Sequence, residues 1–354
     1  MDGARSRSLH MIFSLMIALL LMASSSAASK KKTVGIYELK KGDFSVKITN
    51  WGATVLSVIL PDSRGNLADV VLGYEGLRPY FNETTYFGAL LGRVAGEISQ
   101  ARFTLNGTVY RLYPNDPPNT LHGGRRGFSF VIWSVVETGD GEFPYIKLYY
   151  YSFDNEEGFP GDVDVYVTYM ISGDYELSVT MEATPRTKAT PVSLGLHSYW
   201  NLGGHNSGTI LSNVVQIFAS CYTPDGNGTI STVAGTPLDF RTPQTVGSRI
   251  SQLKEGYNHN YVVDGHGMRK VAAVKDEKTG RAMELWANQP AMVFYTSFYL
   301  ENEQGKGGAV YGRYAALCLE TGGFEDAVNH PEFPSVIVNP GELYRHEMLH
   351  KFSF

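Results

Sequence analysis

Hydrophobic and polar residues alternate with a period of two along most of this chain, which is the pattern of half-buried β-strands. Turns rich in Gly and Pro separate the alternating runs, and the Asn-Gly turn at residues 106–107 predicts a β-hairpin. Helical periodicity is nearly absent, apart from a short candidate helix at residues 77–82. We therefore predict an all-β fold, a large antiparallel β-sandwich. The expected strands are residues 44–50, 54–60, 70–72, 102–105, 108–112, 132–137, 146–153, 163–171, 175–183, 214–218, 261–264, 270–276, 282–287, 291–300, 335–338 and 344–352.

The side chains on one face of residues 190–201 are large and apolar, whereas those on the other face are small, except for one imidazole and one phenol. This strand leaves space beside a single titratable side chain, His197, and we therefore predict that it forms the floor of a ligand-binding site. The alternative is an interior histidine whose ring is hydrogen-bonded within the core. The apolar face holds Val192, Leu194, Leu196 and Trp200, and the small face holds Ser193, Gly195, His197 and Tyr199.

A second run, residues 314–321, ends a stripe of small side chains with a glutamate, Glu320. A carboxylate in an otherwise apolar strand is rarely buried without a partner. The alternative is a carboxylate that reaches water at the end of the strand. If Glu320 and His197 faced one cavity, they would form an acid/base pair with opposite protonation at neutral pH.

The first 28 residues have the pattern of a signal peptide rather than of a folded domain. Arg5 and Arg7 precede a short apolar run at residues 11–22, and small residues at 24–28 suit cleavage. The apolar run is shorter than the roughly 18 residues that a membrane span requires. We expect secretion or delivery to the endomembrane lumen (the apoplast or the vacuole), with no membrane attachment after cleavage. Because no linker or low-complexity segment interrupts residues 29–354, we expect them to form a single domain.

The net charge of −5 is mildly acidic and the sequence holds no basic patch, so nucleic acid is not an expected partner. Two cysteines, Cys221 and Cys318, are too few for a disulfide scaffold. Three Asn-x-Thr sequons, at Asn82, Asn106 and Asn227, lie in turn-like contexts and predict a secreted glycoprotein.

Several short motifs follow one another in a specific order. They are Leu91-Gly-Arg-Val-Ala95, Asn119-Thr-Leu-His-Gly-Gly124, Glu157-Gly-Phe-Pro-Gly161, His197-Ser-Tyr-Trp-Asn-Leu202, Gln289-Pro290 before Phe294-Tyr-Thr296, Leu317-Cys-Leu-Glu-Thr321, Asp326-Ala-Val-Asn329 and Asn339-Pro-Gly341. Together they resemble the aldose 1-epimerase (galactose mutarotase) family, over essentially all of residues 29–354. The resemblance implies a galactose-mutarotase-like β-supersandwich with His197 and Glu320 in one cleft.

The resemblance also implies an isomerase that interconverts the α and β anomers of a hexose such as galactose or glucose, without a cofactor or a metal. In the family, the glutamate matching Glu320 removes a proton from the C1 hydroxyl, and the histidine matching His197 protonates the ring oxygen. His122 matches a second histidine that hydrogen-bonds the sugar, and Gln289 matches a glutamine that contacts it. Tyr199 is expected to line the same pocket. The expected partner is a small molecule, a hexose or related hemiacetal, and the expected assembly is a monomer or weak dimer.

The chain departs from the family pattern beside the expected sugar. After residues 91–95 the family usually has Asn-Arg, with the arginine on sugar hydroxyls, whereas this chain has Gly96 and Glu97. Asn258 replaces an aspartate that accepts hydrogen bonds from the sugar, and Gly322 stands where Gln or a similar residue is usual. The two charge changes together make the pocket one unit more negative if both side chains face it. Each lost charge-assisted hydrogen bond is worth about 1.5–3 kcal/mol.

These departures leave three interpretations open. In the first, Glu97 pairs with Arg93 or Arg102. The other residues at the site, which include Arg93, then still bind an ordinary hexose. In the second, the retained His197 and Glu320 act on a non-sugar hemiacetal or an enolisable ketone, and the added acid favours a neutral or cationic ligand. In the third, the protein is an inactive relative that binds carbohydrate without turnover.

Residues 346–350 spell H-E-x-x-H, the pattern of zinc metalloproteases, in which a helix brings both histidines to one side. Here residues 344–352 alternate as a strand, so Glu347 would point away from His346 and His350. Only four residues follow the pattern, which leaves no room for a later zinc ligand. We therefore predict a strand rather than a zinc site.

Overall fold

The computed structural model describes residues 33–224 and 228–354, and residues 34–354 form one compact unit. The expected signal peptide and the sequon at Asn227 lie outside the described residues. The fold is all-β, as the alternating pattern predicts, and every helix in the described ranges is a three-residue 3-10 turn.

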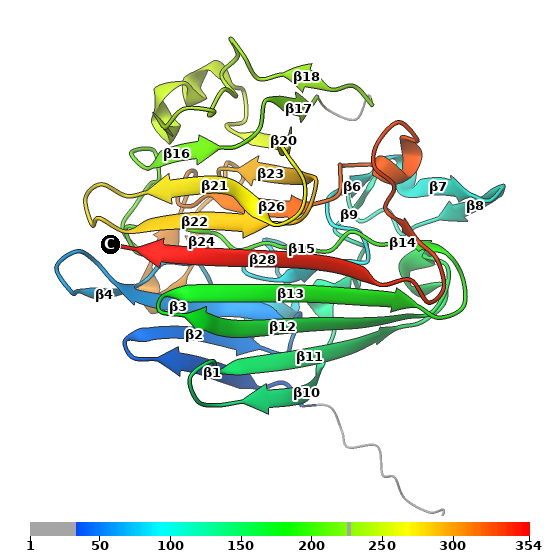
Figure 1. The fold of residues 1–354 in the computed structure, drawn as a ribbon, viewed down its shortest axis with the longest axis horizontal. Helices are drawn as coiled ribbons and strands as arrows, with labels where there is room; N and C mark the ends of the chain where they lie inside the picture. Colours follow the sequence, from blue (N-terminus) through cyan, green and yellow to red (C-terminus); the bar gives the residue numbers. More distant parts are fainter. Residues whose placement is uncertain (1–32, 225–227) are drawn as a thin grey trace, which may run out of the picture. The chain divides into compact units, whose positions relative to one another are not determined.

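The largest sheet has nine antiparallel strands and forms the broad layer in the foreground of Figure 1. Its longest hairpin is formed by residues 163–185, where alternating burial matches the alternating sequence. The last strand of the chain, β28, lies between β13 and β22 and so joins the two halves of the sheet. The strands in spatial order are β10 (Ser134–Gly139), β11 (Tyr145–Ser152), β12 (Val163–Gly173), β13 (Glu176–Pro185), β28 (Tyr344–Ser353), β22 (Ala282–Ala287), β21 (Arg269–Lys275), β16 (Val214–Ile217) and β19 (Gln244–Thr245).

Two smaller sheets pack against the nine-stranded sheet and complete the sandwich. Apolar side chains from all three sheets form one core, in which Trp133, Tyr169 and Trp200 are among the largest buried residues. One sheet consists of β1 (Ile36–Lys41), β2 (Phe44–Thr49), β3 (Thr54–Pro61) and β4 (Leu67–Asp69). The other consists of β18 (Ser231–Thr232), β17 (Cys221–Thr223), β20 (Asn258–Val262), β23 (Ala291–Tyr295) and β26 (Cys318–Gly322).

Short ribbons and 3-10 turns connect the sheets. The hairpin predicted at residues 106–107 is formed by β7 (Arg102–Leu105) and β8 (Thr108–Arg111). The helix expected at residues 77–82 is only the turn η1 (Pro79–Phe81). The other ribbons pair β5 (Leu90–Leu91) with β15 (Gly195–Leu196), β6 (Glu97–Ile98) with β9 (Thr120–Leu121), β14 (Thr190–Pro191) with β27 (Ile337–Val338), and β24 (Glu303–Gln304) with β25 (Val310–Tyr311). The other turns are η2 (Ser99–Ala101), η3 (Phe128–Phe130), η4 (Glu156–Gly158), η5 (Val246–Ser248), η6 (Ile250–Gln252), η7 (Lys306–Gly308) and η8 (Ala327–Asn329).

Residues 190–201 are not the continuous strand that their alternation suggests, because only β14 and β15 are regular. The backbone N–H groups of this segment donate to carbonyls of Val336, Arg93, Ala89 and Leu317 in turn. Since these partners come from distant parts of the sequence, no single neighbour imposes a regular ladder. The alternation of faces is nevertheless retained, with the apolar side chains in the core and the other face toward a cavity.

Several other expected strands differ in extent. Strand β20 covers Asn258–Val262 rather than residues 261–264, β26 covers Cys318–Gly322 rather than residues 314–321, and β27 covers only Ile337–Val338 of residues 335–338. Strand β23 ends at Tyr295 rather than at residue 300, because Ser297 has a φ of 48°, which a strand does not accommodate. Residues 70–72 are buried as expected, but only Val71 makes a strand-like contact, an isolated bridge to Trp200.

The H-E-x-x-H segment is part of β28, as its alternation predicts. His346 and His350 are buried on the core side of the strand. Glu347 lies on the opposite face, where its carboxylate accepts a hydrogen bond from Arg345 at 2.9 Å. The histidines and the glutamate of this segment therefore do not converge on a common point.

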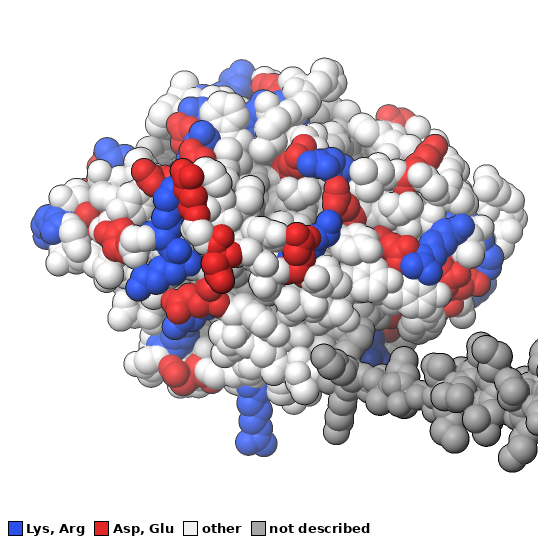
Figure 2. Space-filling view, turned by 60° about the horizontal axis from the view of Figure 1, so that its bottom comes forward, with Lys and Arg blue, Asp and Glu red and all other residues white. Residues whose placement is uncertain are grey.

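Charged side chains of both signs are mixed on the outer surface. Arg345 on β28 pairs with Glu182 on β13 at 3.0 Å, and Lys351 pairs with Glu176 on the same two strands at 3.0 Å. Figure 2 shows positive and negative side chains interspersed over the face in view. Exposed cross-strand pairs of this kind contribute little to stability individually.

Cys221 and Cys318 are both free thiols, the first partly buried in β17 and the second buried in β26. In the part of the chain that the structure describes, none of the helices has the length and apolarity that a membrane crossing requires.

Candidate active site

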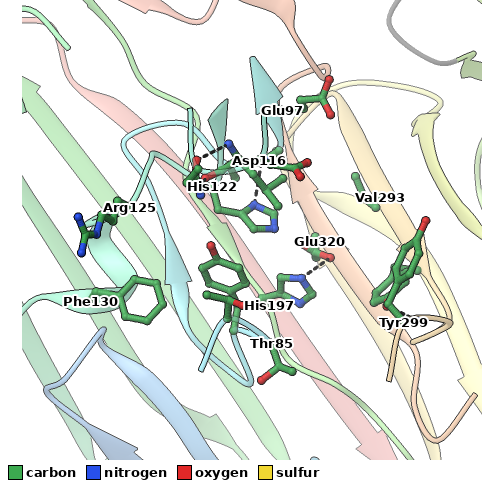
Figure 3. A pocket seen from close by; sticks show the side chains of 18 of the residues that line it. Thr85, Glu97, Asp116, His122, Arg125, Phe130, His197, Val293, Tyr299 and Glu320 are labelled. Atoms are coloured by element: carbon green, nitrogen blue, oxygen red, sulfur yellow. Dashed lines mark hydrogen bonds and ion pairs between the residues drawn. The ribbon is translucent and has the colours of Figure 1, made fainter. Parts of the chain in front are cut away.

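A cavity of about 1680 Å³ lies on the face of the five-stranded sheet opposite the core (Figure 3). Successive residues of each strand point in opposite directions, so one set enters the core and the next lines the cavity. The core-facing residues are Tyr261, Phe294 and Leu319, and the cavity-facing residues are Asn260, Val293 and Glu320. Small-molecule clefts are usually about 300–1,000 Å³, so a ligand of hexose size would fill only part of this one.

His197 and Glu320 face each other within this cavity. The His197 Nε2 atom lies 3.5 Å from the Glu320 Oε1 atom, the contact drawn as a dashed line in Figure 3. Both residues are nearly buried, with exposed fractions of 6 % and 9 %. The His197 backbone is held by bonds to Ala89 and Gly88, each 2.9 Å long. The fold thus brings together the two titratable residues that the sequence singles out separately.

Burial determines the protonation of this pair. It raises the pKa of Glu320 to about 8, and the negative charge of Glu325 acts in the same direction. Burial lowers the pKa of His197 well below its usual range, and His122 lowers it further. At neutral pH the free protein therefore holds one proton on the pair, mainly as a neutral carboxylic acid beside a neutral imidazole.

Aromatic rings fix the orientation of the His197 imidazole. The ring of Tyr199 is stacked on it, with centroids 4.9 Å apart and planes 6° apart. The ring of Tyr86 is also nearly parallel to the imidazole, with centroids 6.2 Å apart and planes 9° apart. The His197 Nδ1 atom is buried and has no hydrogen-bond partner among the described residues. Ring packing, rather than a second carboxylate, therefore holds the imidazole in place.

His122 is presented by a tight glycine-containing loop above the pair. Its Nδ1 atom accepts a hydrogen bond from the Gly96 N–H at 3.1 Å, so the ring proton is on Nε2. Burial lowers the pKa of His122 to about 3, which keeps the imidazole neutral. Its backbone has a φ of 51°, a conformation that is uncommon outside glycine and is often found at functional sites. His122 is therefore a fixed hydrogen-bond donor available to a ligand oxygen.

The same three residues could be considered as metal ligands, since one ligand atom of each of His122, His197 and Glu320 lies within 4.8 Å of the others. However, the Gly96 N–H already occupies the lone pair of His122 Nδ1, and its Nε2 carries the proton. A protonated nitrogen does not coordinate a metal. In this arrangement the group offers proton donors and acceptors rather than a ligand set.

The sequence model of the aldose 1-epimerase family matches residues 35–351. The chain belongs to the aldose 1-epimerase family. The galactose mutarotases of Mus musculus and Homo sapiens are each 38 % identical to it over 329 residues, which cover 91 % of this chain and 94 % of theirs. The aldose 1-epimerase of Escherichia coli is 33 % identical over 315 residues, 84 % of this chain and 89 % of the bacterial one. A solved aldose epimerase homologue from C. elegans superposes with a TM-score of 0.85 at 26 % identity, covering 91 % of this chain and 99 % of that one.

Arg93 matches an aldose 1-epimerase motif but does not line the cavity, so the prediction that it lies at the substrate site is wrong. Its guanidinium donates to the carbonyls of Pro160 and Gly161 at 2.8 and 3.0 Å and to the Ser152 hydroxyl at 2.7 Å. The arginine is 2 % exposed and holds two loops together. The Arg93 guanidinium also donates to the Thr190 hydroxyl and the Phe153 carbonyl at 3.1 Å each, and Glu97 is not among these acceptors.

Gln289 is likewise outside the cavity, which corrects its prediction as a sugar contact. Its amide donates to Asn288 Oδ1 at 3.0 Å and to the Arg345 carbonyl at 3.2 Å, between β22 and β23. The cavity-facing position on β23 is Val293, which pairs across the sheet with Glu320. The Gln-Pro motif marks the start of the strand, and the residue over the cavity comes four positions later.

The positions that depart from the aldose 1-epimerase pattern do surround the cavity. Gly96, Glu97, Asn258 and Gly322 all line it, and Glu97 lies at its upper edge in Figure 3. The Glu97 N–H donates to Glu325 Oε1 at 3.3 Å, so two acidic residues lie close together in this wall. The departures inferred from the family pattern therefore change the chemistry of the site itself.

Besides Val293, the structure places in the cavity wall a polar residue that the sequence does not single out, Asn260. It is 4 % exposed and lines the cavity, and its Oδ1 atom has no hydrogen-bond partner among the described residues. Asn260 pairs with Val293, which in turn pairs with Glu320, so the three lie in one row across the sheet. Its spacing of two residues from Asn258 on an alternating strand is the sequence signal that could have identified it.

Proposed function

We propose that this protein interconverts the α and β anomers of a hexose, such as galactose or glucose, by acid/base opening and closing of the pyranose ring. The observation that carries the proposal is the 3.5 Å contact between His197 Nε2 and Glu320 Oε1 inside one cavity. Membership of the aldose 1-epimerase family supports the same reaction class.

Ring opening moves two protons. A base takes the proton of the C1 hydroxyl, the C1–O5 bond breaks as the C1 carbonyl forms, and an acid protonates O5. Rotation about the C1–C2 bond exposes the other face of the aldehyde, and the reverse steps close the ring. Because the pair holds one proton, Glu320 and His197 can provide the base and the acid together and exchange these roles on closure. No cofactor takes part in these steps.

The family assignment makes Glu320 the base, which requires its carboxylate form when the sugar is bound. In the free protein the proton lies mainly on Glu320. A sugar hydroxyl that donates a hydrogen bond to Glu320 stabilises the carboxylate and moves the proton toward His197. The Nε2–H of His122 is placed to donate to a sugar oxygen while remaining neutral. Substrate binding and proton redistribution are therefore coupled.

A second candidate function is the same acid/base chemistry on a non-sugar hemiacetal or enolisable ketone. The observation that favours it is the location of Glu97, Asn258 and Val293, which place an acid, an amide and an apolar side chain on the cavity wall. An inactive carbohydrate-binding relative would keep the cavity without turnover.

The test is anomer equilibration of freshly dissolved α-D-galactose and α-D-glucose, followed by proton NMR with the purified protein. We expect equilibration above the spontaneous rate for at least one of the two sugars. A folded protein that accelerates neither would contradict the proposal and direct the search to non-sugar hemiacetals. Sugar binding without acceleration, measured by calorimetry, would identify the inactive relative.

We further propose that the protein enters the secretory pathway as a glycoprotein and acts there as a monomer or weak dimer. Support comes from the basic, apolar and small-residue segments of the first 28 residues and from the exposure of Asn82 and Asn106. N-terminal sequencing of the native protein should begin near residue 29, and endoglycosidase treatment should reduce its mass. An intact Met1 with no mass shift would contradict the proposal, and sedimentation would determine the assembly.

A further inference from the structure

The strand that carries the H-E-x-x-H pattern contacts both backbone segments that hold the acid/base pair. Leu194 lies three residues before His197, and Thr321 directly follows Glu320. Tyr344 and His346 of β28 are hydrogen-bonded to these two residues, of which Leu194 packs in the core and Thr321 is also part of the cavity lining. This contact joins the nine-stranded sheet to the floor of the site.

The hydrogen-bond directions in this contact are determined by the groups themselves. The Leu194 carbonyl can only accept, so His346 Nδ1 carries the ring proton and donates to it at 3.1 Å. His346 Nε2 is then an acceptor, and the Thr321 hydroxyl donates to it at 2.8 Å. The Leu194 N–H donates to the Tyr344 hydroxyl at 3.0 Å. The backbone N–H and the backbone carbonyl of Leu194 are thus each hydrogen-bonded to a side chain of β28, those of Tyr344 and His346 respectively.

Burial makes this arrangement rigid and keeps it in one protonation state. Leu194 and His346 are fully buried, and Thr321 is 1 % exposed. Burial lowers the pKa of His346 to about 4, so the imidazole stays neutral and the hydrogen bonds keep their direction above that pH. A second link between the same two segments is the bond from the Gly323 N–H to the Ser193 hydroxyl at 3.0 Å.

We infer that Tyr344, His346 and Thr321 are positioning residues that set the distance between His197 and Glu320. The inference rests on the proposed acid/base function and assigns a role to a motif that this function does not otherwise use. The reaction needs a base and an acid on the same pyranose at once, and their separation is set by the backbones at residues 194–197 and 320–321. A displacement of about 1 Å at a reacting group can reduce turnover by about 10²-fold.

The test uses substitutions that remove one hydroxyl each and keep the side-chain shape. Thr321→Val removes the donor to His346, and Tyr344→Phe removes the acceptor of the Leu194 N–H. Thr321→Ser retains the hydroxyl and serves as the rescue variant. The matched control is Tyr169→Phe, because the Tyr169 hydroxyl is also buried and donates to a backbone carbonyl, that of Ala53 at 2.5 Å, away from the cavity.

We expect Thr321→Val and Tyr344→Phe to lower kcat by about tenfold to a hundredfold, with KM changed by less than about threefold. Tyr169→Phe should lower the melting temperature comparably and leave kcat unchanged, and Thr321→Ser should restore most of the turnover. If the two test variants lower only the melting temperature, as the control does, the positioning role is wrong. If one test variant does not fold, the other decides by the same criterion.

A second readout separates this inference from the proposed function. In protein labelled with ¹⁵N-histidine, His346 should show the neutral Nδ1–H form in the wild type, and the His197 signals should shift in Thr321→Val but not in Tyr169→Phe. An unshifted His197 spectrum would overturn the inference even if no sugar is turned over. Absence of wild-type turnover with the expected shifts would contradict only the proposed function.

Discussion

The single proton shared by His197 and Glu320 is the property from which the chemistry follows. Both side chains are nearly buried and only 3.5 Å apart, so adding or removing one proton creates an uncompensated charge in a poorly solvated site. The protein therefore keeps the pair in its one-proton form over a wide pH range. That form alone contains both an acid and a base.

The first prediction concerns the pH dependence of kcat/KM. Because the pKa of Glu320 is raised to about 8, the pair loses its proton only above that pH, and the rate should fall about tenfold per unit beyond it. Because the pKa of His197 is lowered, the acid limb should lie well below pH 6.5. Initial rates measured by polarimetry between pH 4 and 10 test this. An alkaline limb that begins near pH 5, where an ordinary glutamate titrates, would show that Glu320 is not held protonated.

Asn260 gives a second prediction, about recognition. We expect the unpaired Oδ1 atom of Asn260 to accept a hydrogen bond from a sugar hydroxyl, so Asn260→Leu should lose about 0.5–1.5 kcal/mol and lower kcat/KM for galactose by roughly three- to tenfold. The substitution should lower kcat/KM by the same factor for each deoxygalactose that keeps the hydroxyl bound by Asn260. It should have no such effect for the deoxygalactose that lacks that hydroxyl. Asn213→Leu, a buried asparagine outside the cavity, is the control. An equal loss in kcat/KM for every deoxy sugar would show that Asn260 does not hydrogen-bond the sugar.

The candidate pair could be predicted from local sequence, whereas several contacts could not. Glu320 and His197 each end a stripe of small residues, and that stripe is visible within a few positions of the chain. Arg93 and Gln289 carry family motifs, but the hydrogen bonds that turn them away from the cavity come from residues far along the sequence. A motif fixes which residue is present, and the tertiary partners decide where its side chain points.

The loop between β9 and η3 shows how one element positions a site residue. Gly123 follows His122 with a φ of 87°, and a Cβ atom there would lie 1.9 Å from the Gly92 carbonyl oxygen. The close approach of two backbones, together with the positive φ, leaves room only for glycine. The geometry of His122 therefore depends on its neighbour as much as on its own ring.

The third prediction tests this loop. Gly123→Ala should displace the loop, raise KM for galactose by tenfold or more and lower the melting temperature, because the Gly92 backbone cannot yield easily. Gly107→Ala is the matched control, since Gly107 also has a positive φ, 76°, but no atom lies near its hypothetical Cβ. That control should lose about 1 kcal/mol of stability and keep its KM. An unchanged KM in Gly123→Ala would mean that the loop does not position a sugar contact.

Strands with a regular neighbour were predictable, and irregular ones were not. Residues 163–171 and 175–183 lie in a hairpin, so their alternation and their hydrogen-bond partners are both local in sequence. Residues 190–201 have the same alternation, yet their backbone bonds are distributed over four distant segments. Side-chain periodicity reports the direction that each residue faces, and it carries no information about which backbone pairs with it.

The protein as a whole presents an acidic cavity in a mildly acidic molecule. Among the described residues, seven acidic side chains and two arginines line the cavity, and the net charge of the chain is −5. Glu320 is neutral at neutral pH because its pKa is raised to about 8, whereas the other acidic residues are Glu83, Glu97, Asp116, Glu157, Glu303 and Glu325, and the arginines are Arg125 and Arg126. An anion entering the cavity meets an unfavourable potential, while neutral and cationic ligands do not.

The fourth prediction follows from this potential. At low ionic strength, kcat/KM for galacturonate should be at least about tenfold below that for galactose, and galactosamine should not be disfavoured in this way. Added salt should reduce the difference, because screening weakens the field of partly exposed carboxylates. Rates for the three sugars at 10 and 300 mM salt provide the measurement. Equal rates for galacturonate and galactose at low salt would show that the cavity charge does not select substrates.

The most direct test compares mutarotation of α-D-galactose by the wild type and by Glu320→Gln, which keeps the shape of the side chain and removes its proton chemistry. We expect the wild type to accelerate equilibration and the variant to lose about 10²–10⁴ in kcat while remaining folded. Glu182→Gln, on the outer surface of the nine-stranded sheet, should retain full activity. Wild-type activity that survives in Glu320→Gln would contradict the central assignment of Glu320 and His197 as the reacting pair.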